Sequence, residues 1–218
     1  MIAHTSVWHM AVRTAVVLAG IAGLSGCGQS QGNPADAATI SVTTLDDQDQ
    51  PLRADFNRDR GNVRLMFLVD PICPGCLRGL ADMDRDLLSQ LPSSARVKVY
   101  VVHEPVIGAT SKDVPGAASL LHTTVARHYW NPSGAFGRHV SDALGLRKGD
   151  RPVYAWDVWM IYPPDAVRTD AAPPHPRRLM HQLWDLTGNA NFPFLDSKAF
   201  AKEVRSLLAA MPPQGGSQ

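Results

Sequence analysis

The tetrad Cys73-Pro74-Gly75-Cys76 constrains the fold of this chain more than any other sequence feature. The apolar run 63–69 precedes it and predicts a strand that is buried on both faces. After it, leucine and methionine recur at three- and four-residue spacing with charged residues between them, which predicts an amphipathic helix ending before Pro92. A proline at the first helical position is pre-organised for a helix. The two cysteines are therefore predicted at a strand-to-helix junction.

The position of Cys73 at the start of a helix indicates redox chemistry. Unpaired N–H groups and the helix dipole favour an anion there, and a thiolate is such an anion. Cys76 follows one turn later, where it can form a disulfide with Cys73. A structural zinc site usually needs four ligands, often two such pairs, and this chain has three cysteines. A redox pair is the favoured interpretation.

The third cysteine belongs to a predicted targeting signal. Residues 1–14 contain Arg13 and no acidic residue, 15–24 are apolar or small, and Leu24-Ser25-Gly26-Cys27 follows. This pattern resembles a bacterial lipoprotein signal peptide over 1–26, with lipid on Cys27. Ten apolar residues are too few to span a bilayer, which takes about 20.

The signal-peptide resemblance also implies a location for the rest of the chain. The protein is expected in the bacterial cell envelope, held to a membrane through Cys27 and facing the periplasm, where disulfides persist. Gly28 follows Cys27 in place of the aspartate that retains some lipoproteins in the inner membrane, which favours the outer membrane.

Composition and charge predict one globular domain between flexible ends. Residues 27–37 are rich in small and polar residues and predict a flexible tether, 38–211 a single domain, and 212–218 a disordered tail. The hydrophobic content of 44% is ordinary for a globular protein. The net charge is +1, and lysine and arginine are scattered, which argues against nucleic-acid binding.

The remaining elements follow from apolar spacing. Strands are predicted over 39–45, 96–102 and 155–162, with a further strand after the turn 163–166. Helices are predicted from Pro115 through Tyr129, over 136–144 and from Asp196, and the acidic segment 46–49 is predicted to be a loop. Helical crossovers would make the sheet partly parallel and place the tetrad at the carboxyl end of a central strand, a usual site position.

On the tetrad and this element order, residues 38–211 resemble a thioredoxin-like domain of the lipid-anchored thiol–disulfide oxidoreductase type. The resemblance implies an α/β fold with a central mixed sheet flanked by helices, in one domain. It implies that Cys73 is the exposed attacking sulfur and Cys76 the more buried resolving one, with no cofactor. The implied partners are thiols and disulfides of exported proteins and a redox partner that the sequence does not identify.

The chain departs from that family's pattern at two positions. A cis-proline is expected immediately before the strand that faces the tetrad, and the nearest candidate, Pro152, stands several residues earlier. The buried acid that thioredoxin carries six residues before its first cysteine is replaced by Phe67. Substrate handling and proton transfer are therefore expected to differ from thioredoxin.

Several neighbouring residues are candidates for lining the site. Besides Pro74, Gly75 and Pro152 they are Asp70, His103 and Glu104. Asp70 is either a proton relay or, more simply, a turn former before Pro71. His103 and Glu104 end a strand whose carboxyl edge is expected near the tetrad.

Asp157 is a further unusual residue, because it stands in an otherwise apolar strand. An acid in such a place needs a partner or an exposed face. Asp157 is expected either to stand on the solvent edge of the sheet or to pair with an arginine such as Arg151 or Arg177.

Two alternatives to redox catalysis remain open. A copper or zinc carrier would hold its metal through Cys73 and Cys76 with His103, His128 or Met66, since soft thiolates suit Cu(I); the chain lacks the methionine- and histidine-rich tracts that would support this. A purely structural disulfide would contribute little stability, because the loop it closes is very short.

Overall fold

The computed structural model describes residues 40–170 and 173–213. The chain divides into the units Met1–Ala38 and Thr39–Gln218, and all described residues belong to the second. The predicted signal peptide and tether, and residues 214–218 of the predicted tail, lie outside the described residues. Within the described ranges, no helix has the length and apolar character needed to cross a membrane.

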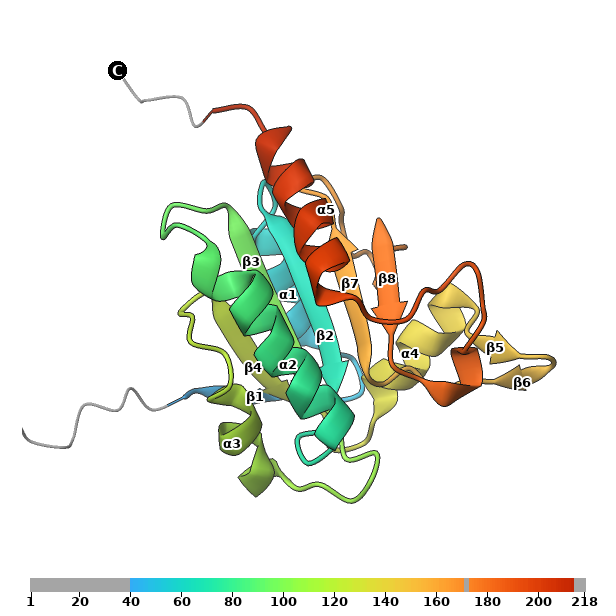
Figure 1. Ribbon diagram of the computed structural model, residues 1–218. Coiled ribbons are helices and arrows are strands. Elements are labelled where there is room, and N and C mark those ends of the chain that lie inside the picture. The colour runs from blue at the N-terminus through green and yellow to red at the C-terminus, as the bar shows by residue number, and fades with distance from the viewer. Residues whose placement is uncertain (1–39, 171–172, 214–218) are drawn as a thin grey trace, which may run out of the picture. The chain divides into compact units, whose positions relative to one another are not determined.

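A six-stranded mixed sheet forms the centre of the domain (Figure 1). Its order is β1-β4-β3-β2-β7-β8, and the first four strands of this order run parallel. Strand β7 is antiparallel to both of its neighbours, β2 and β8. The strands span Val42–Thr44 (β1), Val63–Val69 (β2), Val97–His103 (β3), Ala126–Trp130 (β4), Val158–Tyr162 (β7) and Arg178–His181 (β8). The β2 strand is central, and all seven of its residues are buried.

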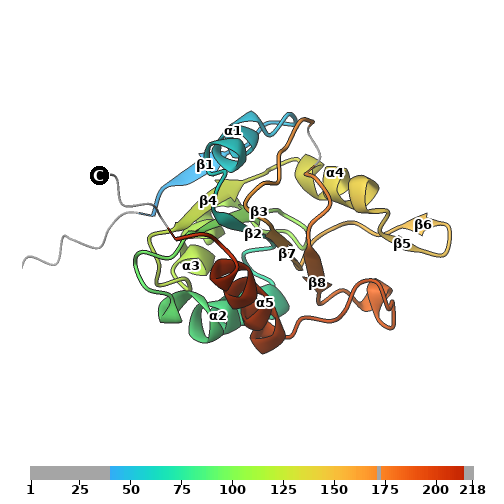
Figure 2. The ribbon, with the colours of Figure 1, turned by 90° about the horizontal axis from the view of Figure 1, so that it is seen from above.

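Helices cover both faces of the sheet, so the domain has three layers (Figure 2). The helices α2 (Pro74–Asp86), α5 (Ser197–Ala209) and the short α3 (Val114–Ala118) lie on one face, and α1 (Gln50–Arg58) and α4 (Ala135–Leu144) on the other. Successive side chains of a strand point to opposite faces. Phe67 and Val69 of β2 therefore join the core under α2 and α5, while Met66 and Leu68 join the core under α1 and α4.

Smaller elements connect these layers. The 3-10 turns η1, η2 and η3 span Leu88–Gln90, Ser111–Asp113 and Trp184–Leu186, and the hairpin strands β5 and β6 span Arg147–Lys148 and Arg151–Pro152. The hairpin projects from the domain beside β8 and η3 (Figure 1).

The predicted thioredoxin-like α/β fold is confirmed. The strand that carries the tetrad lies in the middle, with a parallel neighbour on one side and an antiparallel pair on the other. The predicted strand 63–69 coincides with β2. The predicted final helix begins as expected at Asp196, whose side chain accepts hydrogen bonds from the backbone N–H groups of Lys198 and Ala199.

One predicted segment was wrong, and one helix was not predicted. The helix expected from Pro115 through Tyr129 ends at Ala118, and the chain then forms β4, which inserts between β1 and β3. The segment 46–49 is a loop, as predicted, but the helix that follows it, α1 from Gln50, was not predicted. Leu52 and Phe56 of α1 are fully buried against the sheet.

Candidate active site

Three strand ends meet at the edge of the sheet where the tetrad lies. Leu68, near the carboxyl end of β2, pairs with Val158 at the start of β7. Val158 also pairs with His181, the last residue of β8. Because β7 runs antiparallel to both neighbours, the residues that follow β2, precede β7 and follow β8 lie at the same end of these three strands. This register brings the tetrad, Asp157 and Gln182 together.

The cysteine pair opens α2 as predicted. Cys73 is the N-cap residue and Pro74 occupies the first turn. The Cys73 Sγ accepts a hydrogen bond from the backbone N–H of Cys76 at 3.5 Å, and both cysteines are free thiols. Cys76 has no exposed surface, and Cys73 retains 8% exposure. Cys73 is thus less exposed than the family resemblance implies, although it is still the more accessible of the two.

Asp157 is the charged group next to the sulfurs. It is 4% exposed and has a left-handed backbone conformation with φ of 48°, which is rare outside glycine. Its Oδ1 accepts hydrogen bonds from Trp159 Nε1 at 3.0 Å and from Gln182 Nε2 at 2.9 Å. A carboxylate oxygen of Asp157 and the Sγ atoms of Cys73 and Cys76 lie within 4.8 Å of one another. The predicted arginine partners are wrong: Arg151 pairs with Asp185 and Arg177 with Glu203.

Gly75 allows this close approach. A Cβ atom at Gly75 would lie 3.1 Å from Asp157 Oδ2 and 3.7 Å from Cys73 Sγ. The Oδ2 atom of Asp157 therefore faces the first turn of α2, while Oδ1 faces Trp159 and Gln182. Gln182 Nε2 also donates to the backbone oxygen of Gly75 at 3.1 Å, which ties the end of β8 to the tetrad.

Burial and charge make both Cys76 and Asp157 hard to ionise. Burial raises the pKa of the Cys76 thiol, and the nearby Asp157 charge raises it further. Burial also raises the pKa of the Asp157 carboxyl, against the lowering effect of hydrogen bonds from Gln182, Trp159 and Cys76. A thiol that is hard to ionise thus lies beside a carboxyl that is hard to ionise.

Asp70 forms the turn between β2 and the tetrad. Its Oδ1 accepts from the backbone N–H of Ile72 at 2.9 Å and its Oδ2 from that of Ile107 at 2.8 Å. The Asp70 carbonyl also accepts from Cys73 N at 3.1 Å. Both carboxylate oxygens are thus used by backbone amides, which is the turn-forming role that the sequence also allowed.

Pro152 does not stand directly before β7. It is exposed in the hairpin strand β6, opposite Arg147, and the position before β7 belongs to Asp157. The family's proline position at the tetrad is therefore occupied by an acid in this chain.

His103 and Glu104 are buried near the same sheet edge but face away from each other. His103 Nε2 lies 3.2 Å from His128 Nδ1, and burial lowers the pKa values of the two imidazoles to about 3 and about 4. Glu104 Oε1 accepts from the backbone N–H of Gly137 in α4 at 2.9 Å, and its Oε2 lies 2.9 Å from the Tyr154 hydroxyl. Burial raises the pKa of Glu104 to about 8.

The ligand set expected for a metal carrier does not assemble. Met66 packs into the core under α1 and α4, on the sheet face opposite Phe67 and α2. Among the His, Cys, Asp and Glu residues that the structure describes, the only close group at the pair is Cys73, Cys76 and Asp157. His103 and His128 contact each other instead.

Sequence reasoning singled out Asp157 but missed its position, and it missed Gln182 and Trp159 altogether. The signal for Asp157 was an acid at the start of an aromatic, apolar strand. The partners carry no comparable signal, because their role depends on the antiparallel register of β7 and β8.

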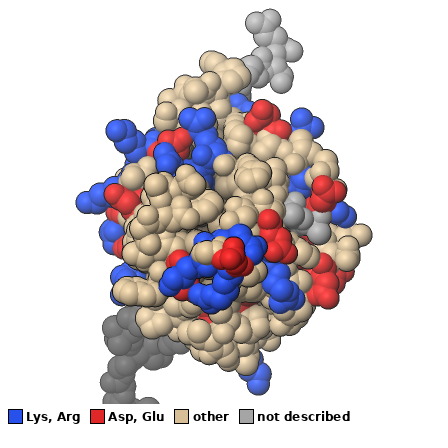
Figure 3. Space-filling view, turned by 90° about the vertical axis from the view of Figure 1, so that its right-hand side faces the viewer, with Lys and Arg blue, Asp and Glu red and all other residues tan. Residues whose placement is uncertain are grey.

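An open groove adjoins Gln182 on the side of the hairpin β5–β6. Its volume is about 510 Å³, and it is lined by Arg151, Pro152, Val153, Tyr154, Trp156, Gln182, Leu183, Trp184 and Asp185. Trp184 is 85% exposed, which is unusual for so large an apolar side chain. Figure 3 shows basic and acidic side chains interspersed on this side of the molecule; Lys148 and Arg151 both pair with Asp185.

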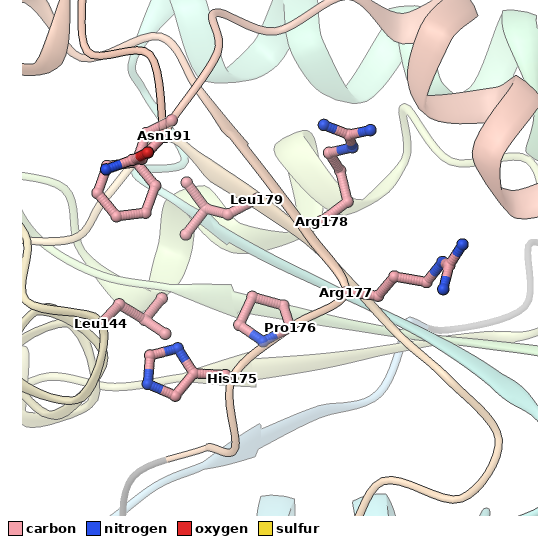
Figure 4. Close-up of a pocket in the computed structure, with 8 residues that line it drawn as sticks. Leu144, His175, Pro176, Arg177, Arg178, Leu179 and Asn191 are labelled. Carbon is pink, nitrogen blue, oxygen red and sulfur yellow. The ribbon is translucent and has the colours of Figure 1, made fainter.

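A smaller hollow of about 140 Å³ lies at the opposite end of β8. Arg177, Arg178 and Leu179 line it together with Leu144, His175, Pro176, Asn191 and Phe192 (Figure 4). The view shows His175 facing Leu144, with the two arginines directed away from them. Since β8 runs from this hollow toward Gln182, the hollow is separate from the cysteine site.

Comparison with known proteins finds distant structural likeness. No family model matches the sequence, and no curated protein matches it. A secreted disulfide oxidoreductase of Mycobacterium tuberculosis, homologous to E. coli DsbE, is 10% identical with a TM-score of 0.37, over 69% of this chain and 85% of that one. An exposed lipoprotein thioredoxin of Streptococcus pneumoniae is 13% identical with a TM-score of 0.39, over 69% of this chain and 88% of that one.

The strand order and the position of the tetrad define the class. The described domain is a thioredoxin-like α/β domain whose central strand leads into a Cys-Pro-Gly-Cys pair at a helix N-terminus. An aspartate, Asp157, lies beside the two sulfurs.

Proposed function

We propose that this chain is a membrane-tethered thiol–disulfide oxidoreductase of the bacterial envelope, which exchanges electrons with disulfides of exported proteins through Cys73 and Cys76. The observation that carries the proposal is the arrangement of two free thiols at the start of α2, where Cys73 is 8% exposed and Cys76 is fully buried. The lipid anchor on Cys27 and the periplasmic location rest on the sequence pattern alone.

The chemistry is two-step thiol–disulfide exchange. The Cys73 thiolate attacks one sulfur of a substrate disulfide, so that a mixed disulfide forms and the other substrate sulfur leaves as a thiolate. Cys76 then attacks Cys73 Sγ, the Cys73–Cys76 disulfide forms, and the second substrate thiolate leaves. Two electrons pass from the cysteine pair to the substrate. Run in reverse, the same steps oxidise a substrate dithiol.

The surroundings of the pair fit this sequence of steps. The Cys76 backbone N–H already points to Cys73 Sγ, where it stabilises negative charge on that sulfur. Exposed Ile72 precedes Cys73, and exposed Ile107 is held beside that turn through Asp70. The groove that ends at Gln182 provides room for an extended segment of a substrate protein next to the tetrad.

Reduction of insulin by dithiothreitol tests the proposal on the purified full-length protein. The wild-type protein is expected to accelerate insulin precipitation, Cys73→Ser to abolish the acceleration, and Cys76→Ser to accumulate a mixed disulfide with insulin. Cys27→Ser is the matched control, since it removes a thiol that is not part of the pair. Equal rates for wild type and Cys73→Ser would show that the chain is not an oxidoreductase.

The same protein preparations also test the metal-carrier alternative. The reduced protein is incubated with zinc or with Cu(I), passed over a desalting column and analysed for bound metal. Under the redox proposal, exchange activity is present and stoichiometric metal does not survive the column. Retention of one metal ion per chain without exchange activity would favour the carrier.

A further inference from the structure

Thiol–disulfide exchange at the two sulfurs does not by itself explain why Asp157 is buried beside Cys76. Cys76 has no exposed surface, so water does not reach its thiol directly. Yet Cys76 has to lose its proton before it can attack Cys73 Sγ, because the thiolate is the nucleophile. A group inside the protein must therefore accept that proton.

We propose that Asp157 is the catalytic base and acid for Cys76, acting through its Oδ2 atom. The inference deepens the proposed oxidoreductase function and rests on it. In the forward direction, Oδ2 takes the proton of the Cys76 thiol as Cys76 attacks Cys73 Sγ, and the departing substrate thiolate takes a proton from solvent. In the reverse direction, Cys76 leaves the disulfide as a thiolate and Asp157 returns the proton to it.

The two oxygens of Asp157 have different surroundings: Oδ1 accepts hydrogen bonds that hold the side chain, and Oδ2 is the oxygen assigned to proton transfer. Trp159 Nε1 and Gln182 Nε2 both donate to Oδ1, at 3.0 and 2.9 Å, and so fix the carboxylate plane. Oδ2 faces the first turn of α2, where it would lie only 3.1 Å from a Cβ at Gly75. A carboxylate oxygen and both sulfurs lie within 4.8 Å of one another. A base must be in such reach before its pKa matters.

No other acid serves the buried thiol in the described part of the chain. The position six residues before Cys73 is Phe67, which packs against Trp159. Asp70 uses both oxygens on backbone amides. His181, the other titratable group facing Asp157, accepts at Nδ1 from Leu183 N and places Nε2 2.9 Å from the Phe192 carbonyl oxygen. These contacts match a neutral imidazole whose two nitrogens are both engaged.

The backbone at Asp157 supports a functional role. A non-glycine residue with φ of 48° costs free energy, and such strain is retained where the side chain has to be held in one place. Here the strained residue directly precedes β7 and directs its carboxylate into the space between β7 and α2.

A two-phase assay separates the two sulfurs. The reduced Cys27→Ser protein, whose only thiols are those of Cys73 and Cys76, is mixed with the aromatic disulfide 5,5′-dithiobis(2-nitrobenzoate) in a stopped-flow instrument. Release of the first aromatic thiol reports attack by Cys73, and release of the second reports attack by Cys76. Asp157→Asn keeps an oxygen acceptor for Trp159 and Gln182 but removes the base. It is expected to slow the second phase on the order of 100-fold and to leave the first unchanged, since general base catalysis typically contributes 10²–10⁴-fold.

Asp82→Asn is the matched control. It makes the same chemical change at the surface of α2, where Asp82 is paired with Arg85, and both phases are expected to keep their wild-type rates. If both phases are unchanged in Asp157→Asn, the inference is overturned while the oxidoreductase function stands. If the Cys27→Ser protein shows no first phase faster than that of free cysteine, the oxidoreductase function itself fails.

Gln182→Ala tests the same idea if Asp157→Asn does not fold. Loss of a hydrogen-bond donor to the carboxylate raises the pKa of Asp157, which is itself unchanged in this variant. The pH at which the rate of the second phase is half-maximal is therefore expected to move upward. An unchanged midpoint in a folded Gln182→Ala protein would contradict the inference.

Discussion

At the scale of single residues, the buried acids of this domain have different tasks. Asp157 lies at the sulfurs, whereas Glu104 lies against α4 and the Tyr154 hydroxyl. The Tyr154 oxygen is 2.9 Å from both Glu104 Oε2 and the Gly134 carbonyl oxygen. The single Tyr154 hydroxyl proton is available to both acceptors, and its hydrogen bond to Glu104 lowers the pKa of that carboxyl. Burial outweighs this effect and raises the pKa of Glu104 to about 8, which favours a neutral carboxyl in the folded protein at pH 7.

This gives a pH-dependent stability with a definite sign. Between the ordinary carboxyl pKa of 4.5 and about 8, the folded state holds a proton that the unfolded state has lost. The free energy of unfolding therefore falls as pH rises through that window, by about 1.4 kcal/mol per pH unit from this group. Glu104→Gln, which is neutral at every pH, is expected to remove that decline. In urea unfolding, the free energy of unfolding of Glu104→Gln is therefore expected to increase relative to that of the wild type from pH 5 to pH 8.

Glu203→Gln on α5 provides the control for that measurement, because Glu203 is paired with Arg177 at the surface. It is expected to follow the wild-type pH dependence. The His103 and His128 pair, whose pKa values are lowered, loses stability as pH falls below about 6.5 in all three proteins and cancels from the comparison. A constant difference between Glu104→Gln and wild type over pH 5 to 8 would contradict a neutral Glu104.

At the scale of elements, α2 and β7 approach so closely that only glycine fits at one position of the helix. A Cβ at Gly79 would lie 2.8 Å from Cη2 of Trp159 and 3.0 Å from Gln182 Nε2. Both residues hold Asp157 Oδ1. The helix-to-sheet contact and the position of the carboxylate are therefore coupled.

Gly79→Ala is expected to lower the free energy of unfolding by about 1–3 kcal/mol, because the added methyl group overpacks a buried interface. Its displacement of Trp159 is measurable in tryptophan fluorescence and near-ultraviolet circular dichroism. Gly116→Ala in α3 is the matched control, since its Cβ meets nothing within 4 Å; it is expected to be neutral or to stabilise by up to about 1 kcal/mol. Equal stability of the two variants would show that the α2–β7 contact can accommodate a methyl group at position 79.

Elements with a single dominant period were predictable, and those with competing signals were not. β2 is a mostly apolar run that contains Arg64, α5 is a capped amphipathic helix, and both were predicted. In 115–129, Ala118, Leu121, Val125 and Tyr129 matched a helical spacing, but the chain satisfies its hydrogen bonds by pairing β4 with both β1 and β3. Helix α1 was hidden because its polar residues outnumber the buried Leu52 and Phe56. Tertiary pairing decided both cases.

The site was predictable only where it is local in sequence. The tetrad, the strand before it and the helix after it follow one another along the chain, so their geometry could be derived from spacing. The partners Asp157 and Gln182 reach the sulfurs through the β2–β7–β8 register, which sequence spacing does not determine. The absence of a proline directly before β7 was visible in the sequence, but the acid that takes its place became apparent only in the fold.

At the scale of the whole molecule, the expected lipid on Cys27 would restrict the domain to a membrane surface. Replacement of that residue, Cys27→Ser, is expected to move the protein from the membrane fraction to the soluble fraction of the envelope and to abolish labelling with a radioactive fatty acid. Cys73→Ser is expected to keep both membrane fractionation and label. Membrane fractionation of Cys27→Ser would show that something other than lipid holds the chain there.

The meeting of three strand ends at the tetrad also affects how the protein matures. The cysteines emerge during synthesis well before the segments that supply Asp157 and Gln182. Until β7 has paired with β2, a growing chain carries two thiols without the carboxylate or the amide that later surround them. The surroundings of the two thiols are therefore complete only when the sheet is complete. An incomplete or truncated chain has the Cys-Pro-Gly-Cys motif without Asp157 and Gln182 beside it.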